Sequence, residues 1–82
     1  MKKTEREIIG IIQKALDVDM PVTIDSSVNS IADWDSLRQI NIIVALDEAM
    51  GGAVSELQEM ATAGSVRQML DILRANGLVA DG

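Results

Sequence analysis

The sequence predicts an all-α fold, a four-helix bundle with a long first loop and a short third helix. Its 82 residues suffice for one small domain, whose core we expect between about residues 4 and 77. Hydrophobic residues make up 48% of the chain but only one residue is aromatic, so the core must be aliphatic, which is typical of helix bundles. Apolar residues recur at helical spacing in four segments.

The first helix is expected over residues 4–16. Thr4 and Glu7 form a capping-box pattern at its start. Gly10 lies inside the helix and costs about 1 kcal/mol relative to Ala, which close approach of a neighbouring helix would explain. The apolar residues that share one face are Ile8, Ile9, Ile12 and Leu16.

A long loop is expected over residues 17–33, because Pro21 and the sequence Asp25-Ser26-Ser27 interrupt the periodicity. A loop of this length must be held by its own apolar side chains. We expect Val22, Ile24, Val28 and Ile31 to do so. Several Asp residues in the loop suggest calcium, but the turn Gly and closing Glu of a calcium loop are missing, so we expect no metal site.

The second helix should begin at Ser36, with Asp35 as its N-cap, and continue to about Met50. It carries two apolar stripes on roughly opposite sides. One consists of Ile42, Ile43, Leu46, Ala49 and Met50, and the other of Leu37, Ile40 and Val44. The second stripe is either additional core or an exposed docking surface, and helix count alone leaves both open.

Two further helices complete the expected bundle. After Gly51-Gly52, residues 54–60 are long enough for a short helix with Val54, Leu57 and Met60 facing inward. Ser65 and Gln68 form a second capping-box pattern before a last helix, which Asn76-Gly77 ends. Its buried face should consist of Val66, Met69, Leu70 and Leu73. We expect the tail after Leu78 to be frayed.

The composition excludes several classes of function. The chain has no Cys and no His, which removes thiol catalysis, imidazole acid-base chemistry and the usual zinc ligands. A net charge of -6 argues against a nucleic-acid partner. No apolar stretch is long enough to insert into a membrane and no signal-type segment is evident, so we expect a cytoplasmic protein.

Ser36 is the candidate functional residue. A hydroxyl in the first turn of a helix lies at the positive end of the macrodipole, where a phosphate ester would be favoured. Ser is also common near helix starts for capping reasons alone, so local sequence leaves both interpretations open.

The motif Asp35-Ser36-Leu37, preceded by Trp34 and placed after a long loop, resembles the acyl carrier protein family in its Trp-Asp-Ser-Leu form. The resemblance covers about residues 4–73. It implies an acyl-carrier-like fold and a 4'-phosphopantetheine arm on Ser36, attached from coenzyme A by a phosphopantetheinyl transferase. The thiol of the arm would hold an acyl or aminoacyl group as a thioester and present it to loading and transferring enzymes. The chain itself would catalyse nothing.

The same resemblance implies roles for other residues. Partner enzymes would contact Asp35, Leu37, Arg38, Ile40, Asn41, Val44, Asp47 and Glu48. An acyl chain would be sheltered by Ile43, Leu46, Val54 and Met60. Carriers of fatty acid synthesis usually have acidic residues where Arg38 and Asn41 stand, so we expect a carrier of a specialised fatty acid, polyketide or related pathway. We also expect the protein to be a monomer. The alternative is a small helical adaptor that binds a partner through the second stripe and is never modified.

Overall fold

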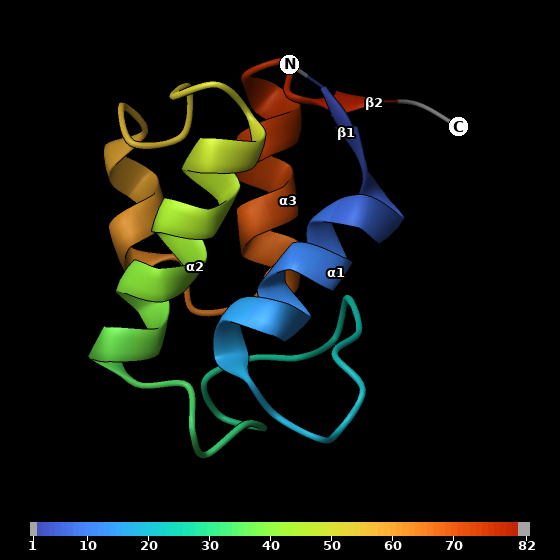
Figure 1. Ribbon diagram of the computed structural model, residues 1–82, viewed down its shortest axis with the longest axis vertical. Helices are drawn as coiled ribbons and strands as arrows, with labels where there is room; N and C mark the ends of the chain where they lie inside the picture. Colours follow the sequence, from blue (N-terminus) through green and yellow to red (C-terminus); the bar gives the residue numbers. More distant parts are fainter. Residues whose placement is uncertain (1, 81–82) are drawn as a thin grey trace.

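The computed structural model describes residues 2–80, which form a mostly helical domain with three α-helices, a 3-10 helix and a pair of short strands (Figure 1). In chain order the elements are β1 (Lys3–Thr4), α1 (Glu5–Leu16), α2 (Ser36–Ala49), η1 (Gln58–Thr62), α3 (Val66–Ala75) and β2 (Val79–Ala80). The buried side chains of all three α-helices, the first loop and η1 belong to one contiguous core. No helix within residues 2–80 combines the length and the hydropathy needed to cross a bilayer.

Helix α1 has the expected start. The Thr4 hydroxyl accepts a hydrogen bond from the Glu7 N–H at 3.2 Å, and the Glu7 carboxylate accepts one from the Thr4 N–H at 3.1 Å. This arrangement is a complete capping box, as predicted. Ile8, Ile12 and Leu16 are completely buried.

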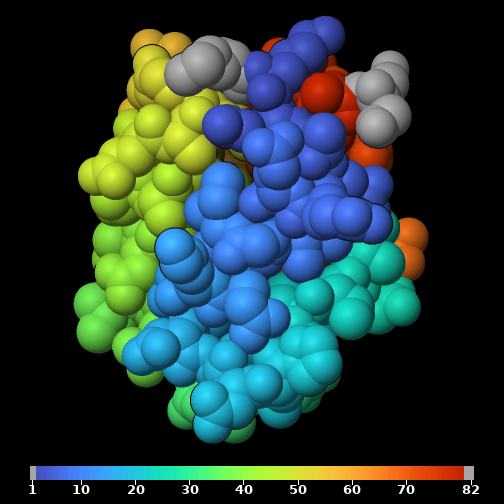
Figure 2. Space-filling model, turned by 45° about the vertical axis from the view of Figure 1, so that its right-hand side comes forward, coloured from blue at the N-terminus to red at the C-terminus, as the bar shows by residue number. Residues whose placement is uncertain are grey.

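Gly10 does not mark a close helix contact. The residue is exposed, and a Cβ atom added there would meet nothing within 4 Å. The expectation that a neighbouring helix packs against Gly10 is therefore wrong. Figure 2 shows α1 on an open face of the molecule, with the first loop continuing below it.

The first loop is held at its start by the side chain of Gln13. Its Nε2 donates to the carbonyl oxygens of Val18 and Met20 at 2.8 and 2.9 Å, and its Oε1 accepts from the Val22 N–H at 2.7 Å. These bonds satisfy backbone groups that have no partner within the loop itself.

Further along, the loop pairs with the start of α3. The Val66 N–H donates to the Ser26 carbonyl at 3.0 Å, and the Val28 N–H donates to the Gly64 carbonyl at 2.9 Å. The predicted anchors Val22 and Ile31 are buried. Val28 is 43% exposed, so it contributes a backbone contact rather than the buried side chain that we expected.

Helix α2 packs mainly against α1. Ile42 and Leu46 are completely buried on the predicted inner face, and Met50 is buried just past the end of the helix. Gly51 and Gly52 follow with φ angles of 67° and 89°, in the left-handed region that glycine adopts without strain.

The predicted short α-helix over residues 54–60 is wrong. The helical turn begins later, at Gln58, and is a 3-10 helix. Side chains of α2 explain the difference, because they bind backbone groups at both ends of this segment. The Asp47 carboxylate accepts from the N–H groups of Val54 and Ser55 at 3.1 and 2.7 Å, which holds those residues in a turn. Within the described residues, η1 therefore takes the place of the short third helix that we predicted, and three α-helices remain instead of four.

Helix α3 begins at the predicted N-cap, since the Ser65 hydroxyl accepts from the Gln68 N–H at 3.1 Å. The Gln68 side chain, however, accepts from the Gly64 N–H at 3.0 Å, so the expected capping box is displaced by one residue. Its predicted buried face is confirmed: Val66, Met69, Leu70 and Leu73 are all completely buried.

The end of α3 is also as predicted. The N–H groups of Gly77 and Leu78 donate to the carbonyls of Arg74 and Leu73, and Gly77 has a φ of 72°, which is a Schellman motif.

The chain after Leu78 is ordered as far as it is described, contrary to our expectation. Lys3 pairs with Val79 and Thr4 with Ala80, in a parallel register. Val79 is buried against the core, which explains why these residues are held. Residues 81–82, which were also expected to fray, lie outside the described part of the chain.

Candidate functional site

Ser36 is exposed and is the first residue of α2. Asp35 is the N-cap, as predicted, and its carboxylate accepts from the Arg38 N–H at 2.9 Å. The remaining free N–H groups of this turn and the helix dipole create a positive potential near the Ser36 hydroxyl. The position can therefore accommodate a covalently attached anion and is open to a second protein.

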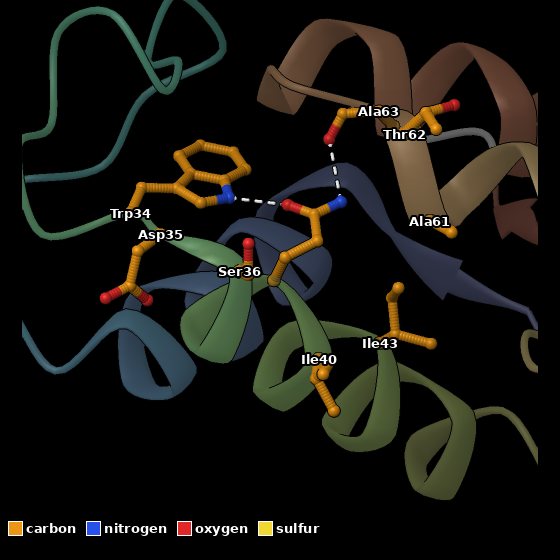
Figure 3. A pocket seen from close by; sticks show the side chains of 9 residues that line it. Trp34, Asp35, Ser36, Ile40, Ile43, Ala61, Thr62 and Ala63 are labelled. Carbon is orange, nitrogen blue, oxygen red and sulfur yellow. Dashed lines mark hydrogen bonds between the residues drawn. The ribbon is translucent and has the colours of Figure 1, made fainter.

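A pocket of about 440 Å³ lies beside Ser36, between the start of α2 and η1 (Figure 3). Figure 3 shows Trp34 and Ser36 on one side of the pocket, Ala61, Thr62 and Ala63 on the other, and Ile40 and Ile43 on α2 below them. The lining residues are Trp34, Asp35, Ser36, Gln39, Ile40, Ile43, Ala61, Thr62 and Ala63. The pocket is mostly apolar, with the Ser36 hydroxyl at its edge.

Gln39 connects the two sides of this pocket. Its Oε1 accepts a hydrogen bond of 2.6 Å from the indole N–H of Trp34, and its Nε2 donates to the carbonyls of Met60 and Ala63 at 2.8 and 2.9 Å. Trp34 is only 4% exposed, so its N–H needs a partner within the protein.

Neither the role of Gln39 nor the burial of Trp34 was predicted from the sequence. One signal was present: Gln39 is an amide beside the apolar residues of α2, and a buried amide has to find partners. Two of those partners, the carbonyls of Met60 in η1 and of Ala63 just after it, are more than twenty residues away and could not be predicted from the pattern.

The second apolar stripe of α2 is exposed. Leu37, Ile40 and Val44 are 60%, 57% and 50% accessible, which decides between the two alternatives left open by the sequence. Asn41 and Glu48 are exposed beside the stripe. An exposed apolar stripe with a polar margin is typical of a docking surface.

Two of the expected partner contacts also have roles inside the fold. Arg38 is half-buried, and its Nε donates to the Leu16 carbonyl at 3.1 Å. Asp47 is half-buried and holds the turn before η1. Their side chains are therefore only partly available to another molecule.

Of the residues expected to shelter an acyl chain, only Ile43 lines the pocket. Leu46, Val54 and Met60 lie in the core and are at most 1% exposed. The pocket that is open in this structure thus lies at the edge of the core, against Ala61 of η1 and Ala63, the residue that follows η1.

No family model matches this sequence, and comparisons with characterised proteins and with solved structures give no match. Within residues 2–80, no group of three or more acidic side chains lies close enough together to hold a metal ion. A functional proposal therefore depends on the geometry around Ser36 and on the resemblance in the motif itself.

Proposed function

We propose that this protein is a carrier that holds acyl or aminoacyl groups as thioesters on a 4'-phosphopantetheine arm attached to Ser36. The observation that carries the proposal is the exposed Ser36 hydroxyl at the first residue of α2, between an apolar pocket and an exposed apolar stripe. The hydroxyl suits attachment of an arm, the pocket suits contact with that arm, and the stripe suits contact with an enzyme.

The attachment chemistry suits this position. Transfer from coenzyme A forms a bond between the Ser36 Oγ and the phosphorus of phosphopantetheine. It breaks the pyrophosphate bond of coenzyme A, with adenosine 3',5'-bisphosphate as the leaving group, and releases the hydroxyl proton. The phosphodiester that results is an anion at the positive end of α2, where backbone N–H groups and the dipole stabilise it. The thiol of the arm would also supply the nucleophile that this chain lacks, since it has no Cys.

The arrangement of elements supports an acyl-carrier-like fold. A long first loop precedes α2, and η1 lies where such a carrier would have its short third helix. We propose a fold of that type, with a 3-10 turn in place of a regular short helix.

Partner enzymes would dock on α2. Leu37, Ile40 and Val44 offer the apolar contacts, while Asp35, Asn41 and Glu48 are exposed nearby. A phosphopantetheinyl transferase and the enzymes that load and unload the arm would use this surface in turn. Arg38 and Asn41 stand where carriers of fatty acid synthesis usually have acidic residues. This difference favours a dedicated pathway in the cytoplasm, such as specialised fatty acid or polyketide synthesis, over a housekeeping role.

Intact-protein mass tests the proposal. After co-expression with a broad-specificity phosphopantetheinyl transferase, we expect the unmutated protein to gain the mass of one phosphopantetheine. Ser36→Ala should gain none, while Ser55→Ala, which removes another exposed serine, should be modified like the parent. No mass gain on the unmutated protein would overturn the carrier proposal.

The exposed stripe also favours a second candidate, an unmodified helical adaptor. Such a protein would use Leu37, Ile40 and Val44 to bind one partner and would not need the Ser36 hydroxyl. The same mass measurement separates the candidates, because only the carrier acquires an arm.

A further inference from the structure

Within residues 2–80, Gln39 is the only side chain that makes hydrogen bonds both to the segment before Ser36 and to the opposite wall of the pocket. We propose that Gln39 is a positioning residue for Ser36, which holds the Trp34–Ser36 turn and η1 in one fixed arrangement. This inference rests on the proposed function, because its consequence is the rate at which Ser36 is modified.

The hydrogen bonds of Gln39 permit one orientation of its amide. Both hydrogens of the NH₂ group are donated, to the Met60 and Ala63 carbonyls, and the amide oxygen accepts from the Trp34 indole. Turning the amide by 180° would place oxygen against two carbonyl oxygens and NH₂ against an N–H. All three contacts would then be repulsive, so the amide is locked.

Helix η1 depends on this contact. It is five residues long and has no side-chain cap at its start, and 3-10 helices have poorer hydrogen-bond geometry than α-helices. From α2, the described side-chain hydrogen bonds to residues 54–63 come from Asp47 at one end and Gln39 at the other. Loss of Gln39 would release the end that forms the pocket wall.

Trp34 depends on the contact as well. Its indole is almost completely buried two residues before Ser36, and Gln39 Oε1 is its hydrogen-bond acceptor. Without that acceptor, the buried N–H would have to turn toward water, and the backbone that leads to Ser36 would move with it. A transferase would then meet a less ordered serine, although the hydroxyl itself would be unchanged.

The coupling can be tested first on the unmodified protein. In Gln39→Ala we expect amide hydrogen exchange about tenfold faster at residues 34–36 and 60–63 together, the factor that one or two lost hydrogen bonds produce. Trp34 is the only aromatic residue, so tryptophan emission reports this site alone and should shift to longer wavelength.

Gln39→Glu separates the two halves of the contact. A carboxylate still accepts from the Trp34 N–H but cannot donate to carbonyls. Its second oxygen would also repel the Met60 and Ala63 carbonyls, which now face Gln39 Nε2. We therefore expect faster exchange at residues 60–63 than in Gln39→Ala, with a smaller shift of the tryptophan emission than in that variant. This variant also decides the question if Gln39→Ala fails to fold.

The matched control is Gln13→Ala. Gln13 likewise makes three hydrogen bonds to a neighbouring loop, but none of them reaches Trp34 or η1. We expect it to lose stability without a change in tryptophan emission or in exchange at residues 60–63.

Transferase kinetics then test the positioning role. For Gln39→Ala we expect kcat/KM to fall about tenfold, with the loss mainly in KM, while Gln13→Ala stays within about twofold of the parent. Equal kcat/KM for the two variants, or parental exchange and emission in Gln39→Ala, would overturn the inference. If the unmutated protein is not modified at all, the proposed function fails, and the exchange and emission results still decide whether Gln39 couples the two walls.

Discussion

The Nε atom of Arg38 lies 3.1 Å from the carbonyl oxygen of Leu16 and donates a hydrogen bond to it. Leu16 is the last residue of α1, where backbone carbonyls lack partners within the helix. A cation is favoured there by the negative end of the helix dipole. The only basic residue of α2 therefore joins the first turn of α2 to the last turn of α1.

Replacing Arg38 should therefore affect stability. Arg38→Met keeps much of the side-chain length but removes the charge and the hydrogen bond, and we expect the free energy of unfolding to fall by about 1 kcal/mol. Urea denaturation measures this change. Arg6→Met, on an exposed position of α1, should stay within about 0.5 kcal/mol of the parent. Equal stability of the two variants would contradict the role assigned to Arg38.

Asp47 should matter more for folding than the adjacent acid. Asp47→Ala leaves the N–H groups of Val54 and Ser55 without their acceptor, so we expect a loss of about 1–2 kcal/mol in the free energy of unfolding. Asp47→Asn retains an acceptor oxygen and should lose less. Glu48→Ala is the control, because Glu48 is exposed beside it. Thermal or urea unfolding distinguishes the three, and a larger loss in Glu48→Ala would refute the assignment.

Gly10 is a site where stability can be gained. Gly10→Ala should raise the free energy of unfolding by about 1 kcal/mol, because alanine is the better helix former and its Cβ meets nothing at this position. Gly77→Ala should do the opposite, since Gly77 has a φ of 72° at the end of α3. Comparison of the two melting temperatures checks both signs, and a destabilised Gly10→Ala would show a contact that the structure lacks.

The capping box of α1 should make stability depend on acid pH. The Thr4 backbone N–H, and then its hydroxyl, hold the pKa of the Glu7 carboxyl below its ordinary value of 4.5. A lowered pKa in the folded state means that the ionised carboxylate stabilises the fold above pH 4.5, and that this contribution disappears as pH falls through the lower, folded value.

Glu7→Gln isolates this effect, because it retains the shape of the side chain without the charge. We expect the parent to melt at the higher temperature near neutral pH and the difference to shrink as pH falls below 4.5. Melting curves of both proteins between pH 7 and pH 3 provide the measurement. A difference that stays constant over that range would be inconsistent with a lowered pKa.

The parts of the fold that sequence predicted are those controlled by neighbouring residues. Thr4 and Glu7 are three residues apart, and so are Ser65 and Gln68, so the start of each helix could be recognised from local spacing. The helix that was predicted wrongly lies in residues 54–63. There, the side chains of Gln39 and Asp47 in α2 bind backbone groups that a regular helix would pair internally. The spacing of apolar residues does not predict such contacts.

In the candidate site, too, the features set by neighbouring residues could be predicted and those set by distant contacts could not. The position of Ser36 and the Asp35 cap followed from residue order, and the two stripes of α2 followed from helical geometry. Whether Leu37 lay inside or outside depended on how many elements surround α2, which only the structure shows. The pocket could not be predicted, because Trp34 and Ala63 come together through the path of two loops.

The parallel pairing of β1 and β2 has a practical consequence. Figure 1 shows the paired strands at one end of the domain and the start of α2, which is Ser36, toward the opposite end. A fusion partner, affinity tag or solid support joined through either strand would therefore project away from the serine. A tether attached there would leave the surface around Ser36 uncovered.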